Sequence, residues 1–130
     1  MISGHVNSKL EAVISLSIIG LQGEVREVEA VIDTGFSDYL TLPVEVVTAL
    51  GLSSIGVEQL TLADGSEITA YLCPVTIIWD GQPRAVEADT LESEVLVGMA
   101  TLKGYELDAS IVVGGRVTIK PLSPAQPLTT

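Results

Sequence analysis

The triplet Asp33-Thr34-Gly35 is the place in this chain where residue types and spacing could do chemistry. It follows the apolar run 30–32, so an acid, a hydroxyl and a glycine stand at the end of an expected strand. Burying a carboxylate there is costly unless hydrogen bonds or a raised pKa compensate. Asp33 is therefore a candidate general acid or base. The alternative is a structural turn in which its side chain only accepts backbone N–H groups.

The chain lacks the residues that most other catalytic mechanisms require. Cys73 is the only cysteine and His5 the only histidine, which excludes most zinc sites and most serine or cysteine hydrolases that need a histidine base. We expect no metal site and no cofactor. His5 is expected to be a surface residue in a frayed N-terminal stretch, and Cys73 to pack within a strand.

The excess of acidic side chains limits the kinds of partner that the chain can bind. The 130 residues carry 6 basic and 17 acidic side chains, a formal net charge of −11, which opposes binding to nucleic acid or to an anionic membrane. No run approaches the roughly 20 apolar residues of a membrane span, and the N-terminus does not resemble a signal peptide. The expected location is cytoplasmic.

The composition predicts a mainly β domain, because 16 Val, 11 Ile and 11 Thr favour pleated strands. Residues 10–19 and 24–32 read as a hairpin around Gly20–Gly23. Asp64-Gly65 and Asp80-Gly81 each separate two strand-like runs, as tight hairpin turns do. A fourth pair is expected from 109–113 and 116–120 around Gly114-Gly115.

Two short helices interrupt the strands. One is predicted over 43–50, with proline in its first turn and Gly51 just past its end, and the other over 98–103 before Gly104. The folded part is expected to begin near residue 8, within a single domain assigned to residues 1–120. Residues 121–130 contain three prolines and read as a loose tail.

The ordered set of motifs resembles the retroviral-type (retropepsin-like) aspartic proteases, especially their small bacterial members. The resemblance lies in the triplet at 33–35, in the segment 41–52 that follows it, in the hairpin 62–66 and in the run 95–98. It covers nearly the whole folded region. It implies an all-β, closed acid-protease barrel of hairpins with one or two short helices.

The resemblance also implies a function, that of an aspartic endopeptidase acting on peptide or protein substrates. With one such aspartate per chain, a homodimer would bring two Asp33 carboxylates together on its two-fold axis. Thr34 would form a hydrogen bond across that axis, and the Gly35 N–H would orient the Asp33 carboxylate. The flap that closes over substrate would be the turn formed by Ala63, Asp64, Gly65 and Ser66.

Several residues have structural interpretations. Asp108 lacks a following glycine and is expected to be a strand residue, not a second catalytic acid. Trp79 is expected to anchor a sheet face, and Phe36 to pack on the barrel, with narrowing of a substrate pocket as the alternative. Charges such as Glu87 and Asp89 are expected on solvated strand faces and loops.

Two other functions stay open from the sequence. The first is a non-catalytic dimerisation or peptide-binding module on the same barrel, and the second is a small-ligand β-barrel. The family's Gly-Arg-Asp or Gly-Arg-Asn continuation is absent, because Met99 and Ala100 follow Gly98. The proline-rich end would not interleave with a partner's end, so the interface is expected to end before Pro121 or to be built differently.

Overall fold

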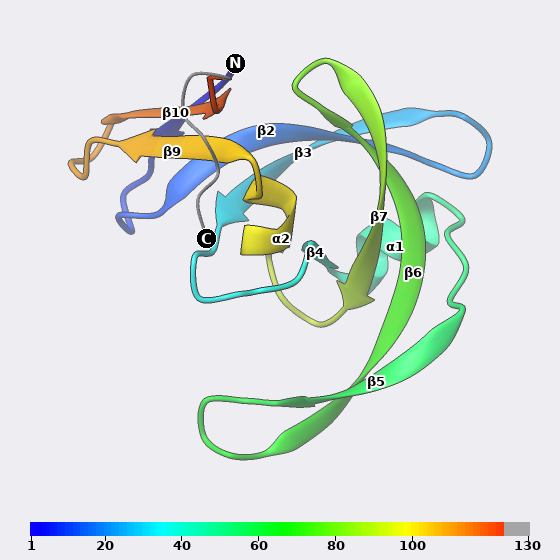
Figure 1. Ribbon diagram of the computed structural model, residues 1–130. Helices are drawn as coiled ribbons and strands as arrows, with labels where there is room; N and C mark the ends of the chain where they lie inside the picture. The colour runs from blue at the N-terminus through cyan, green and yellow to red at the C-terminus, as the bar shows by residue number, and fades with distance from the viewer. Residues whose placement is uncertain (124–130) are drawn as a thin grey trace.

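The computed structural model describes residues 1–123, which form one ten-stranded, strongly curved sheet with two short helices (Figure 1). The strands are β1 (Ile2–Val6), β2 (Ala12–Ile19), β3 (Val25–Ile32), β4 (Leu40–Leu42), β5 (Gly56–Thr61), β6 (Glu67–Trp79), β7 (Gln82–Thr90), β8 (Val95–Val97), β9 (Tyr105–Ala109) and β10 (Arg116–Pro121), and the helices are α1 (Val44–Ala49) and α2 (Met99–Leu102).

The sheet closes on itself through β6. Its strand order is β5-β6-β7-β4-β8-β3-β2-β1-β10-β9, and an additional antiparallel pairing joins β6 to β2. Strands β2, β3, β8, β4, β7 and β6 therefore form a closed barrel. The expected all-β barrel with short helices is confirmed.

Local turn chemistry accounts for the hairpins. Gly65 between β5 and β6 has a φ of +85°, while Asp80 and Gly81 between β6 and β7 have φ values of +52° and +80°. Such positive φ values suit tight turns between twisted antiparallel strands. The predicted hairpins at Asp64-Gly65 and Asp80-Gly81 are confirmed, as is the β2–β3 hairpin.

Both helices occur where they were expected. Pro43 is the N-cap of α1, and Gly51, with a φ of +67°, follows its C-cap residue Leu50. Helix α2 is one turn long. No helix within residues 1–123 is long and apolar enough to cross a membrane.

The last hairpin differs from the prediction. Its first strand is β9, which ends at Ala109, whereas the sequence suggested a strand from Ala109 to Val113. Residues 110–115 form a loop, in which the Ser110 N–H donates to the Arg116 carbonyl and the Gly115 N–H to the Val112 carbonyl. The Gly114 N–H donates to Val6 O, which holds this loop against β1. The β-branched residues at 111–113 are consequently exposed.

The N-terminal residues are part of the sheet. Strand β1 lies between β2 and β10, with Gly4 opposite Ile14 and also opposite Val117. The expectation of a frayed N-terminus was therefore wrong, because the partner strand β10 is too distant in sequence to be inferred locally. Strand β10 includes Pro121, the first residue of the expected tail, and the remainder of that tail from residue 124 lies outside the described residues.

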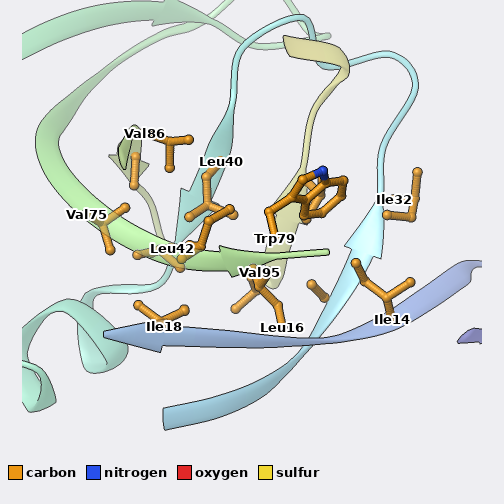
Figure 2. Packing of buried hydrophobic residues seen from close by; sticks show 14 of the residues in the cluster. Ile14, Leu16, Ile18, Ile32, Leu40, Leu42, Val75, Trp79, Val86 and Val95 are labelled. Carbon is orange, nitrogen blue, oxygen red and sulfur yellow. The ribbon is translucent and has the colours of Figure 1, made fainter. Parts of the chain in front are cut away.

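The hydrophobic core fills the barrel. Figure 2 shows apolar side chains from several strands converging around Trp79, which is 3% exposed. The Trp79 ring also meets Tyr105 edge-on, with a centroid distance of 5.7 Å. Trp79 is thus the sheet-face anchor that was expected, and Cys73 is buried within β6.

One acidic residue is buried, contrary to prediction. Asp89 on β7 is 4% exposed, not solvated, because the segment after β3 and strand β5 cover this end of β7. Burial raises the pKa of its carboxyl to about 6, and repulsion from Glu58, a hydrogen bond with Glu58, and the charges of Asp38 and Glu87 add to the effect.

This raised pKa makes stability depend on pH. Between about pH 4 and pH 6 the folded chain keeps the Asp89 proton that the unfolded chain has lost, so the free energy of unfolding falls as pH rises through that window. In buffer without divalent cations, Asp89→Asn should raise the free energy of unfolding at pH 7.5 by on the order of 2 kcal/mol. The variant should also show a smaller decrease of this free energy between about pH 4 and pH 6. Urea unfolding across pH 4–8 measures this, with Asp108→Asn as the exposed control. Equal pH dependence in both variants would contradict it.

Candidate active site

Asp33 is held at the end of β3 by backbone hydrogen bonds. Its N–H donates to the Val97 carbonyl at 2.9 Å, which extends the parallel β3–β8 pairing by one residue. The chain then turns: the Phe36 N–H donates to the Asp33 carbonyl at 3.2 Å, and the Gly35 N–H to Asp33 Oδ1 at 3.0 Å. The Asp33 side chain is half-buried, while Thr34 and Gly35 are exposed. A carboxylate is thus fixed by its own turn and open to solvent on one side.

The segment after Asp33, residues 34–39 (the active-site loop), is tied to β8 and α2. The Gly98 N–H donates to Tyr39 O, the Met99 N–H to Phe36 O at 2.7 Å, and the Ala100 N–H to Asp38 O. The Thr101 hydroxyl adds a bond of 2.6 Å to the Tyr39 carbonyl. Loop and helix therefore form one hydrogen-bonded unit.

Gly98 is required for this close approach. A Cβ built at Gly98 would overlap the Asp38 carbonyl oxygen and press on the Phe36 ring. The half-buried Phe36 ring thus lies over Gly98, which supports the packing role over that of narrowing a pocket. The run 95–98 accordingly lies against the active-site loop.

Arg84, which the sequence analysis missed, braces the same unit from β7. Its Nη1 donates to the Thr101 carbonyl at 2.7 Å and its Nη2 to the Ala100 carbonyl at 3.4 Å. The guanidinium also lies 5.9 Å from the centre of the Tyr39 ring. It satisfies carbonyls of α2 that the helix leaves without partners. The sequence lacks the arginine that the resemblance would place after Gly98. In this structure the arginine that contacts α2 is Arg84, which comes from β7.

The proposed flap residues form the exposed tip of the β5–β6 hairpin, which extends away from the barrel in Figure 1. The Ser66 hydroxyl and N–H both donate to Asp64 Oδ1, at 2.6 and 2.9 Å. These bonds hold the pKa of the Asp64 carboxyl below its usual value. The tip therefore keeps its turn, and its negative charge, in mildly acidic solution.

Asp33 and Thr34 border a cavity of about 560 Å³ that is otherwise mostly apolar. Its wall includes Leu96 from β8, Leu107 from β9 and Ile111 from the 110–115 loop. Two further acids, Glu11 and Glu94, lie at the same cavity. The carboxylate of Asp33 therefore stands beside an apolar surface.

The structure brings together some of the sequence-identified residues and separates others. Asp33, Thr34 and Gly35 share one turn, whereas the tip residues 63–66 lie on a different hairpin. Asp108 is an exposed residue of β9, opposite Thr118, as expected of a strand residue. His5 is exposed on β1.

Comparison with known proteins identifies the fold. No protein-family model matches the chain, and no curated protein matches its sequence. A crystal structure of a retropepsin-like aspartic protease from Rickettsia conorii is similar, with a TM-score of 0.60 over 94% of this chain and 91% of that chain, at 15% sequence identity. This chain has the retropepsin-like fold. At that identity the likeness extends to the fold and not further.

The contacts of Arg84 generate a prediction. Replacing Arg84 with Ala removes two charged hydrogen bonds from α2 and the contact with Tyr39, and should cost about 2 kcal/mol. The thermal midpoint should fall by several degrees, and Arg84→Lys should recover only part of it, because an ammonium lacks the planar fork. Calorimetry measures both variants. A midpoint unchanged by Arg84→Ala would show that the guanidinium does not brace α2.

Proposed function

We propose that this protein is an aspartic endopeptidase that acts as a homodimer, with Asp33 of each copy as a catalytic residue. The observation that carries the proposal is the Asp33-Thr34-Gly35 turn at the end of β3 in a retropepsin-like fold. The Gly35 N–H orients Asp33 Oδ1, and Val97 holds its backbone, so the carboxylate has a defined direction. A turn with a structural role alone would not need a carboxylate that is open to solvent on one side.

Two copies are needed because hydrolysis of an amide by water uses one carboxylate as general base and another as general acid. Each chain has one Asp-Thr-Gly. A two-fold axis beside Asp33 places the two side chains against each other, where like charges cannot both ionise and one proton is shared. The pair then titrates as a unit.

The reaction follows from that shared proton. The ionised Asp33 removes a proton from a water held between the carboxylates, and the water oxygen bonds to the scissile carbonyl carbon. The protonated partner donates its proton to the carbonyl oxygen, which gives a tetrahedral diol. Collapse of the diol breaks the C–N bond as a proton passes to the leaving nitrogen. Thr34 and Gly35 support the geometry without bonding covalently to the substrate.

The substrate we propose is an extended peptide. Strand β5 is the first strand of the sheet, so its outer edge has backbone groups with no strand partner among the described residues. Such an edge pairs with an extended chain by backbone hydrogen bonds, and pockets then select alternate side chains. The β5–β6 hairpin would act as the flap, stiffened by the Gln59–Thr69 side-chain bond of 3.0 Å.

The dimer face would lie around the 560 Å³ cavity. Leu10 and Ile111 line that cavity together with Asp33 and Thr34, and their side chains are 56% and 59% exposed. Val112 and Val113 are exposed in the same loop. Apolar side chains gathered beside a catalytic acid are what a self-complementary interface requires. This face would replace the interleaved chain ends of retroviral enzymes.

Asp33→Asn tests the chemistry. An amide cannot share the proton, so cleavage of a peptide library should fall by at least about 10³-fold, while the fold and the dimer persist. Asp108→Asn, an exposed strand position, serves as the control. Retained cleavage in Asp33→Asn would refute the catalytic assignment. If the wild type binds library peptides but cuts none, and Asp33→Asn binds equally, the binding-module alternative holds instead.

Val112→Asp tests the interface. A carboxylate in each copy would meet its symmetry mate, so dimer dissociation should become at least about tenfold easier and activity at low protein concentration should drop. Val25→Asp is the matched control, because both valines are 63% exposed and Val25 lies at the far end of β3. Sedimentation equilibrium with activity against concentration measures both. Equal behaviour of the two variants would place the interface elsewhere.

A further inference from the structure

Three carboxylates from distant parts of the chain meet near the C-terminal end of β7. Asp38 comes from the active-site loop, Glu58 from β5 and Asp89 from β7. One oxygen from each lies within 4.8 Å of the other two. None of the three takes part in the catalytic geometry proposed for Asp33.

One carboxylate oxygen of the buried member of this group lacks a hydrogen-bond partner. Asp89 Oδ2 is buried and accepts no hydrogen bond from any of residues 1–123. The side chain is 4% exposed, and it borders a cavity of about 130 Å³ with Asp38, Glu58 and Glu87. A buried, ionised oxygen without a donor is costly, so a positive group in the cavity would be strongly favoured.

Among residues 1–123, no ion pair joins a basic group to any of these three carboxylates. The ion pairs in the described chain join Met1 to Asp80, Arg26 to Glu45 and Lys120 to Glu106. Arg84, whose guanidinium lies over the ring of the cavity-lining Tyr39, donates its hydrogen bonds to carbonyls of α2.

We propose that Asp38, Glu58 and Asp89 bind a divalent cation of the hard, oxygen-preferring class, with Ca²⁺ as the best fit. Three oxygens no more than 4.8 Å apart all lie within about 2.8 Å of a common point, close to the roughly 2.3–2.6 Å of calcium–oxygen bonds. Every donor is a carboxylate oxygen, and Asp38 is exposed, so water can complete the irregular shell that Ca²⁺ accepts and Mg²⁺ does not.

A bound cation would connect the flap hairpin to the active-site loop. Glu58 is opposite Ala70 in the β5–β6 pairing, and Asp38 is five residues after Asp33. The site stands independently of the proposed protease function, because its ligands and its binding test do not involve Asp33.

The alternative occupant is the ammonium or guanidinium of a basic side chain. A single positive charge would leave three carboxylates only partly neutralised, whereas a divalent cation offsets two of them. The geometry therefore favours the metal ion, and an organic amine is included as a separate arm of the experiment.

Calorimetric titration of the full chain with CaCl₂ at pH 7.5, with terbium luminescence sensitised by Tyr39 at the cavity wall, tests the site. We expect one ion per chain, a thermal midpoint raised by about 3–5 °C at 5 mM CaCl₂, and a smaller rise with MgCl₂. Asp89→Asn should abolish binding while remaining folded, and Glu58→Gln should weaken it at least tenfold. Asp108→Asn should bind as the wild type does.

Three outcomes would overturn the proposal. The first is a midpoint no higher in CaCl₂ than in NaCl of equal ionic strength. The second is an equal calcium response in Asp89→Asn and the wild type. The third is stabilisation by ethylamine hydrochloride where CaCl₂ has no effect, which would assign the carboxylates to a basic side chain.

Discussion

The hydrogen bond from the Asp33 N–H to the Val97 carbonyl is the constraint on which the rest of the site depends. It continues the parallel pairing of β3 with β8 out of the core, where Val97 is fully buried, to the first residue of the turn. The position of the carboxylate is therefore set by the packing of the barrel. The loop that follows adds bonds to α2, so the turn cannot shift without moving β8 and α2 together.

The same arrangement gives two aspartates opposite environments. Asp33 directly follows β3, and one of its carboxylate oxygens accepts a backbone N–H while the carboxylate stays open to solvent on one side. Such an environment suits a group that must exchange protons. Asp89 lies near the C-terminal end of β7, beside other acids and without a donor on Oδ2. Residue type alone does not distinguish them. The difference comes from which strands lie alongside, and an acidic chain of net charge −11 offers few basic side chains to compensate.

Local chemistry made much of the fold predictable. The positive φ of Gly65 and Gly81 follows from Asp-Gly pairs, and Pro43 and Gly51 bracket α1 for similarly local reasons. Pairings between distant strands carry no such signal. The strand at 116–120 was therefore predicted, but β1 and its pairing with that strand were not. The alternation of β7 fails at Ala88-Asp89-Thr90, which are all buried because the active-site loop covers that end, and no pattern in the strand itself reveals it.

For the candidate site, sequence and structure contribute differently. The Asp33 turn is visible as a triplet after an apolar run, but Arg84 is not, since its reach to α2 depends on how β7 crosses the barrel. The run 111–113 illustrates the converse error. Three β-branched residues in a row suggest a strand, yet the Gly114 N–H bonds to Val6 O and the segment becomes an exposed loop.

The pairing of β1 with β10 also governs the order in which the chain can fold. Ile2 lies opposite Ile119, so β1 pairs on this edge with a strand that is synthesised much later in the chain. Loop-closure entropy makes such long-range contacts slow to form. Until β10 has been synthesised, one edge of β1 lacks its partner strand and can pair with another unfolded chain.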